Sequence, residues 1–86
     1  MDQILKNKVA IVTGGSSGMG RAGVELFSEA GCQSVIADIN EKEGNKIKEN
    51  LKKKNLKADF IYTDVIDSKN VQSTVNQIIK KYGRID

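Results

Sequence analysis

The segment 13–20, Thr-Gly-Gly-Ser-Ser-Gly-Met-Gly, constrains the fold more than any other part of this chain. It follows a short apolar, β-branched run at 8–13, which is typical of a buried parallel strand. The residues after it, 21–30, predict a helix whose buried face contains Ala22, Leu26, Phe27 and Ala30. A strand, a glycine turn and a helix together favour phosphate binding, because small residues let an anion approach the first helical N–H groups.

The glycines of this segment have distinct expected roles. Gly14 would permit the tight turn, Gly18 the close approach of an anion, and Gly20 the close packing of the helix on the strand. The hydroxyls of Ser16 and Ser17 are additional hydrogen-bond donors. The segment is therefore suited to a nucleotide.

The residues 18–23 match the Gly-x-Gly-x-x-Gly fingerprint of dinucleotide-binding folds. Taken alone, the pattern also fits a glycine-rich turn that binds no ligand. A P-loop is excluded, because Arg21 and Ala22 stand where lysine and serine or threonine are required. The rest of the chain is therefore needed to distinguish a dinucleotide-binding turn from a turn that binds no ligand.

Two further strand and helix pairs follow the first. Apolar runs predict strands at 35–38 and 58–63. Amphipathic patterns predict one helix at 41–54 and another that follows a cap at Asp67 or Ser68 and ends at Gly83. This alternation predicts an α/β fold, βαβαβα, with parallel strands and right-handed crossovers. It corresponds to the N-terminal half of a Rossmann-type three-layer fold, with strand order 3-2-1, in a single partial domain at 1–86.

Capping residues predict where the helices begin and end. Gly31 and Gly83 are typical of the left-handed residue that follows a helix. Asn40, with a glutamate three residues later, resembles a capping box, and Asp67 or Ser68 would cap the third helix. The expected buried positions are Gly44, Ile47 and Leu51 in the second helix and Val71, Val75, Ile78, Ile79 and Tyr82 in the third.

Composition limits the class of protein. With 38% hydrophobic and 29% charged residues, the 86 residues are those of a small globular domain and not of a disordered chain. The single cysteine, Cys32, excludes an internal disulfide framework and is expected to be a small buried side chain in a reducing compartment. Because histidine is absent, a transition-metal site is not expected. No apolar run approaches the ~20 residues of a membrane span, and a signal-peptide core is missing, so we expect a cytoplasmic protein with no membrane partner.

Asp38 is the most informative single residue. It lies 20 positions after Gly18, at the end of the second strand, where a dinucleotide fold places the acid that binds the adenosine ribose. A carboxylate accepts hydrogen bonds from both ribose hydroxyls and repels a 2′-phosphate, which favours NAD over NADP. The alternative is a solvated turn aspartate, which the glycine loop at the matching distance disfavours. Asp64 and Val65 end the third strand at the equivalent place, although by themselves they fit an ordinary loop.

A lysine cluster lies on and after the second predicted helix. Nucleic-acid binding is one interpretation, but no aromatic residues interleave with the lysines for base stacking. Lysines near the end of a helix also suit its dipole. A solvated helix face is therefore favoured, with no nucleic-acid partner, for Lys46, Lys48, Lys52, Lys53, Lys54 and Lys57.

Four motifs, in order and at matching spacing, make the chain resemble the short-chain dehydrogenase/reductase family from Asn7 onward. They are Thr13-Gly14-x-x-x-Gly18-x-Gly20, Asp38, Asp64-Val65 and the closing Tyr82-Gly83-Arg84-Ile85-Asp86. The resemblance implies an NAD(P)-dependent oxidoreductase, usually a dimer or tetramer, that moves a hydride between the nicotinamide and an alcohol or ketone carbon.

The resemblance also implies cofactor contacts by position. The loop 14–20 would hold the pyrophosphate and the nearby ribose, Asp38 the adenosine ribose, and Ile39 would flank the adenine, whose edge Asp64 and Val65 would bind. NADP-using relatives often carry a basic residue at the place of Ser17, so serine there again indicates NAD. The expected cofactor-binding residues are Gly14, Ser16, Ser17, Gly18, Met19, Gly20, Asp38, Ile39, Asp64 and Val65.

The family's catalytic motifs do not occur in these 86 residues. Its members continue into a fourth strand with an Asn-Asn-Ala-Gly motif, a catalytic serine and a Tyr-x-x-x-Lys pair. Tyr62 and Tyr82 are followed four residues later by Ile66 and Asp86, so neither forms such a pair. We therefore expect the cofactor-binding part of such an enzyme, inactive by itself; the alternative is a stand-alone nucleotide-binding or sensor module.

Overall fold

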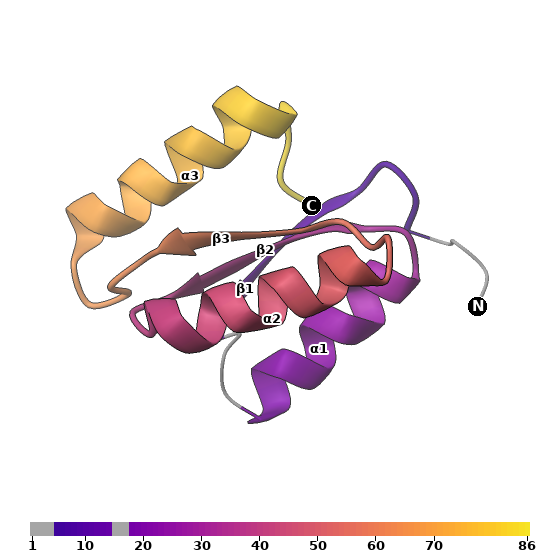
Figure 1. The fold of residues 1–86 in the computed structure, drawn as a ribbon. Coiled ribbons are helices and arrows are strands. Elements are labelled where there is room, and N and C mark those ends of the chain that lie inside the picture. The colour runs from indigo at the N-terminus through magenta and orange to yellow at the C-terminus, as the bar shows by residue number, and fades with distance from the viewer. Residues whose placement is uncertain (1–4, 15–17) are drawn as a thin grey trace.

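The computed structural model describes residues 5–14 and 18–86. Its elements are β1 (Val9–Thr13), α1 (Gly18–Glu29), β2 (Gln33–Asp38), α2 (Glu41–Lys53), β3 (Ala58–Tyr62) and α3 (Ser68–Tyr82). The strands form one parallel sheet in the order β1-β2-β3. The helices α1 and α2 lie together on one face of the sheet and α3 lies on the other, which makes three layers (Figure 1). The predicted fold class and strand order are confirmed.

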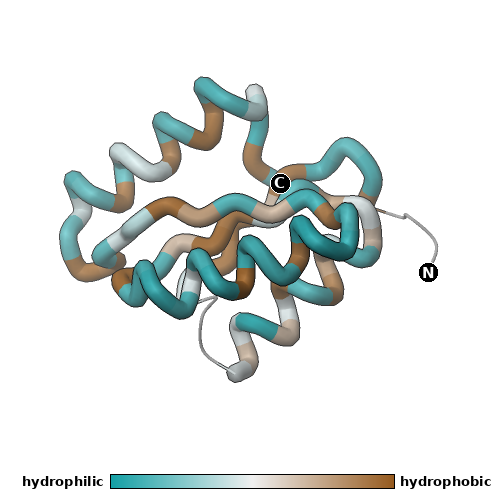
Figure 2. Tube along the Cα trace, in the orientation of Figure 1, coloured by the Kyte–Doolittle hydropathy of each residue, from teal (hydrophilic) through white to brown (hydrophobic). Residues whose placement is uncertain are grey.

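An apolar cluster lies on each face of the central strand β2, because successive side chains of a strand point to opposite faces. Figure 2 shows hydrophobic residues along the strands and recurring along the helices between hydrophilic stretches. Toward α1 and α2, Ile36 is buried with Val24, Ile47, Leu51 and Ala58. Toward α3, Val35 is buried with Val9 and Ile78.

The helices end and begin at the expected capping residues. Gly31 has φ 92°, and its N–H donates to Ser28 O at 3.1 Å while the next N–H donates to Phe27 O at 3.0 Å, which is a Schellman motif. Gly83 has φ 82° and ends α3. The Asn40 side chain accepts from the Glu43 N–H at 3.1 Å. At α3 the cap is Asp67 and not Ser68, which is the first helical residue.

The buried face of α1 differs from the prediction. The helix begins at Gly18, three residues before the expected start, and buries Val24 and Ser28. Of the residues expected on the buried face, Ala30 is buried, but Ala22 is exposed, and Leu26 and Phe27 are 56% and 38% exposed. Ser28 belongs to the buried face because its hydroxyl donates to Ser34 Oγ at 3.0 Å, a pairing that apolar spacing does not reveal.

The buried face of α3 also contains a polar residue that the pattern missed. Thr74 is buried with Ile78, and its hydroxyl lies 2.7 Å from the hydroxyl of Thr63. Ile79 is 49% exposed, contrary to expectation, because the step from Ile78 turns it about 100° away from the sheet. The other expected positions, Val71, Val75 and Tyr82, are half-buried.

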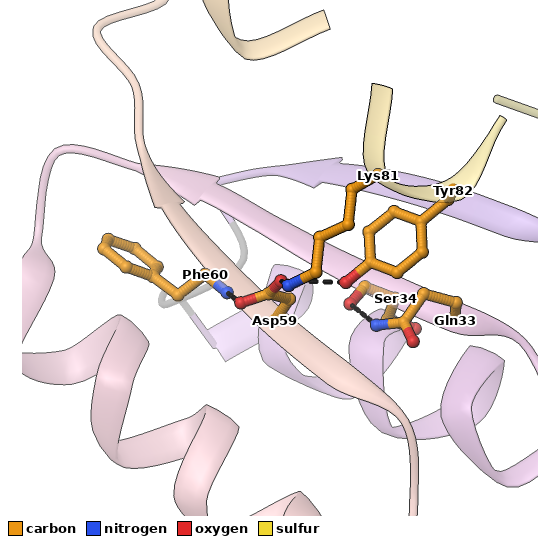
Figure 3. A network of polar contacts seen from close by, with 6 residues as sticks. All are labelled: Gln33, Ser34, Asp59, Phe60, Lys81 and Tyr82. Atoms are coloured by element: carbon orange, nitrogen blue, oxygen red, sulfur yellow. Dashed lines mark hydrogen bonds and ion pairs between the residues drawn. The ribbon is translucent and has the colours of Figure 1, made fainter. Parts of the chain in front are cut away.

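A polar cluster centred on Asp59 attaches the end of α3 to the start of β3 (Figure 3). Asp59 Oδ2 accepts from Lys81 Nζ and from the Tyr82 hydroxyl, each at 2.8 Å, and Oδ1 accepts from the Phe60 N–H at 2.9 Å. Partial burial works to raise the pKa of Asp59, but the hydrogen bonds from Lys81, Tyr82 and Phe60 outweigh it and leave that pKa below its usual value. The ionised carboxylate is therefore the form that the folded chain favours.

We predict that Gly44→Ala lowers the free energy of unfolding. Gly44 faces Phe60, and an added Cβ would lie 2.3 Å from Phe60 Cε2, far inside van der Waals contact. The aromatic ring must shift to admit the methyl group, and overpacking of this kind costs about 1–3 kcal/mol. Urea unfolding followed by circular dichroism measures the change.

Gly23→Ala is the matched control on α1. A Cβ there meets no heavy atom of the described part of the chain within 4 Å. Alanine is the better helix former by about 0.5–1 kcal/mol, so this variant should be at least as stable as the parent. Equal losses in both variants would contradict the packing explanation.

We predict that Asp59 makes folding depend on pH in the acid range. Its pKa is lower in the folded than in the unfolded chain, so its stabilisation is present above the unfolded pKa of roughly 4 and is lost as the pH falls through the folded pKa. Unfolding measured from pH 7 to pH 3 should lose more stability in the parent chain than in Asp59→Asn. Glu49→Gln, at an exposed position of α2, is the charge control. A parent and an Asp59→Asn chain with parallel pH profiles would show the prediction to be wrong.

Candidate functional site

The candidate site lies where the three parallel strands end. Thr13 pairs in register with Ala37, and Asp38 pairs with Tyr62, so the strand ends lie level with one another. The carboxyl ends of parallel strands share one edge of the sheet, which is where open α/β sheets bind ligands. The described residues that follow β1, β2 and β3, among them Gly14, Ile39 and Asp64, therefore lie along this edge, which we call the rim.

The turn after β1 has the backbone geometry that glycine provides. Gly14 has φ 64°, in the left-handed region that favours glycine, and its N–H donates to Ala37 O at 3.1 Å. The hydrogen bond extends the pairing of β1 with β2 into the turn. Gly14 thus has the conformation predicted for it, whereas the expected contacts of Ser16 and Ser17 fall on residues outside the described part of the chain.

The N-terminus of α1 is open at the rim. Because α1 begins at Gly18, the backbone N–H groups of 18–20 belong to the first turn, where a helix leaves its N–H groups without intrahelical partners. A Cβ at Gly18 would meet no heavy atom within 4 Å among the described residues. Met19 is 91% exposed and Gly20 is half-buried. An anion can therefore approach this turn closely.

Asp38 is held at the end of β2 by the start of α2. Its Oδ1 accepts from the Asn40 N–H at 3.2 Å, and its backbone carbonyl accepts from the Thr63 N–H at 3.0 Å. The side chain is half-buried, whereas the next residue, Ile39, is 61% exposed. The rim therefore combines a fixed carboxylate with an accessible apolar side chain.

The loop after β3 has the same combination. Asp64 is half-buried, its N–H donates to Asn70 Oδ1, and its own Oδ1 accepts from the Ile66 N–H at 3.0 Å. Val65 and Ile66 are 57% and 92% exposed. Sequence reasoning did not single out Ile66 and Asn70; the available signals were an isoleucine between Asp64 and Asp67 and an asparagine three residues after the expected cap Asp67.

Cys32 and the lysine cluster lie outside the rim. Cys32 is 1% exposed, and burial raises the pKa of its thiol, so it is a packed side chain. The lysine cluster on α2 is exposed except for the half-buried Lys48. Across residues 5–14 and 18–86, no cluster of His, Cys, Asp or Glu is arranged to hold a metal ion. Over the same ranges no helix is long and apolar enough to cross a membrane.

Known proteins are similar to this chain in sequence and in fold. An uncharacterized oxidoreductase of Thermotoga maritima is 41% identical over 83 residues, which are 96% of this chain and 32% of the relative. Tropinone reductase-like 1 of Erythroxylum coca is 43% identical over 82 residues, 95% of this chain and 29% of the relative. The crystal structure of a hydroxysteroid dehydrogenase from Escherichia coli matches with a TM-score of 0.92 at 26% identity, over 99% of this chain and 35% of that one.

The chain thus spans about a third of the length of these relatives. Residues 8–86 match the family model described as short chain dehydrogenase, whose members use NAD or NADP. This match takes in the glycine turn, Asp38 and the loop after β3. The chain therefore belongs to the short-chain dehydrogenase/reductase family and corresponds to the N-terminal third of its members.

Proposed function

We propose that this chain is the NAD-binding segment of an oxidoreductase that moves a hydride between NAD(H) and an alcohol or ketone carbon of a small-molecule substrate. The observation that carries the proposal is the meeting of Gly14, Asp38 and Asp64 along one rim of the sheet. The nicotinamide ring supplies the hydride acceptor or donor when the cofactor is bound. We propose further that the complete enzyme is a homo-oligomer, as the family resemblance implies, and that it is cytoplasmic.

The rim fits the phosphate part of the dinucleotide. The first turn of α1 presents backbone N–H groups at Gly18, where an added Cβ would meet no heavy atom within 4 Å among the described residues. The positive end of the helix dipole lies at this turn, so the pyrophosphate would be stabilised there by partial charge and by hydrogen bonds. Ser16 and Ser17 are proposed to add hydroxyl donors.

The rim also fits the adenosine part of the cofactor. Asp38 would accept hydrogen bonds from the ribose hydroxyls, and a 2′-phosphate at the same place would meet its negative charge. This repulsion is the reason for proposing NAD over NADP. The exposed side chains of Met19, Ile39 and Val65 would contact the cofactor, with Ile39 flanking the adenine and Asp64 and Val65 at its edge.

We predict that Asp38→Ala reverses the cofactor preference. The substitution removes charge-assisted hydrogen bonds to the ribose, each worth roughly 1.5–3 kcal/mol, and about 1.4 kcal/mol is a factor of ten. The affinity for NAD should fall by about tenfold or more, while the affinity for NADP should rise because the repulsion is gone. Isothermal titration calorimetry of the parent chain and of Asp38→Ala with each dinucleotide gives the two dissociation constants.

Glu49→Gln is the control for this experiment, because it removes one negative charge from an exposed position of α2 away from the rim. It should leave the ratio of the two dissociation constants unchanged. An unchanged ratio in Asp38→Ala would remove Asp38 from the ribose site.

We also predict that the 86-residue chain binds NAD without catalysing its reduction. Its sequence contains no Tyr-x-x-x-Lys pair to transfer a proton to or from the substrate oxygen. NADH absorbance followed with a panel of alcohols and ketones should match a control without protein. Sustained turnover above that control would sink the prediction.

A further inference from the structure

The first turns of α3 are hydrogen-bonded to the rim by side chains that the cofactor proposal does not use. The Thr74 hydroxyl lies 2.7 Å from the Thr63 hydroxyl and within 3.1 Å of the Asn70 carbonyl oxygen. Thr63 in turn donates its backbone N–H to Asp38 O at 3.0 Å. Through Thr63, α3 is thus connected to the strand end that bears Asp38.

Asn70 makes the most direct of these connections. Its Oδ1 accepts the N–H of Asp64, the first residue after Thr63 at the end of β3. Its own N–H donates to the capping carboxylate of Asp67 at 3.3 Å, which places Asn70 in the first turn of α3. Asn70 is therefore held by two hydrogen bonds, one from its backbone N–H and one to its side-chain oxygen.

The Asp64 carboxylate belongs to the loop that this backbone contact attaches to α3. Asp64 Oδ1 accepts from the Ile66 N–H at 3.0 Å, and Asp64 O accepts from the Asp67 N–H at 3.1 Å, so the loop closes on itself. Asn70 holds the entry of that closed loop against α3. Without it, the N–H of Asp64 would lose its partner and the loop could turn.

We propose that Asn70 is a positioning residue for adenine recognition: it holds Asp64 and Val65 so that the Asp64 carboxylate meets the exocyclic amino group of the base. The inference rests on the proposed function, because it needs the adenosine part of NAD at this rim. A carboxylate accepts a hydrogen bond from an amino group but repels the carbonyl oxygen that replaces it in hypoxanthine. Asn70 should therefore control selectivity for the base rather than affinity for the rest of the cofactor.

The test compares NAD with nicotinamide hypoxanthine dinucleotide, which differs only in the base. Both are titrated against the 86-residue chain, its Asn70→Ala variant and its Asn70→Asp variant, with amide chemical shifts as the readout. The parent chain should prefer NAD by about tenfold, the value of one good hydrogen bond. Asn70→Ala should reduce that preference to about twofold or less, and Asn70→Asp, which keeps an acceptor oxygen of the same reach, should restore most of it.

Asn76→Ala is the matched control, since Asn76 is exposed on α3 and its side-chain oxygen accepts from the neighbouring Gln72 amide at 2.9 Å. It should keep the parent's preference. Merely structural damage from Asn70→Ala would weaken both ligands equally and leave the preference at its parental value, which would overturn the inference. A parent chain that binds both dinucleotides equally would overturn it as well. A parent chain that binds neither would instead overturn the proposed function on which it rests.

Discussion

The pairing of β2 between β1 and β3 is the interaction on which the rest of the structure depends. Parallel neighbours need helical crossovers, and the crossovers cover both faces of the sheet, so the middle strand must be apolar on both sides. Val35 and Ile36 meet this requirement, because both are fully buried and each belongs to one of the two apolar clusters. The same pairing brings the ends of the strands level and thereby creates the rim.

The residues of the rim lie at or just beyond the ends of the strands. The loops after β2 and β3 are each fixed by a side chain or N–H at the start of the helix that follows. Asp38 is held by the N-terminus of α2, and Asp64 by Asn70 of α3. The crossover helices therefore also orient the carboxylates, so the contacts that form the fold also form the candidate site.

The two faces of the sheet are held differently. Toward α1 and α2, the contact is mostly apolar, with Gly44 allowing α2 to approach Phe60 of β3 closely. Toward α3, polar contacts contribute through Thr74 near the middle of the helix and through the Asp59 cluster at its end. Buried hydroxyl pairs and ionised clusters need their partners in place, since an unpaired buried polar group is costly. These polar contacts therefore fix one position of α3 along the sheet.

The order of elements, the strand order and most helix ends were predictable from the sequence, and so were Gly14, Asp38 and Asp64 as rim residues. These features depend on local chemistry: a positive φ at Gly14 and Gly83, the spacing of apolar residues, and the place where a strand ends. The faces of α1 and α3 were not fully predictable, because the burial of Ser28 and Thr74 depends on hydroxyl partners distant in the sequence, Ser34 in β2 and Thr63 just after β3. The role of Asn70 was hidden for the same reason, since its partner is chosen by how α3 folds back on β3. Local propensity determines what a segment becomes, whereas only tertiary packing determines which polar groups find each other.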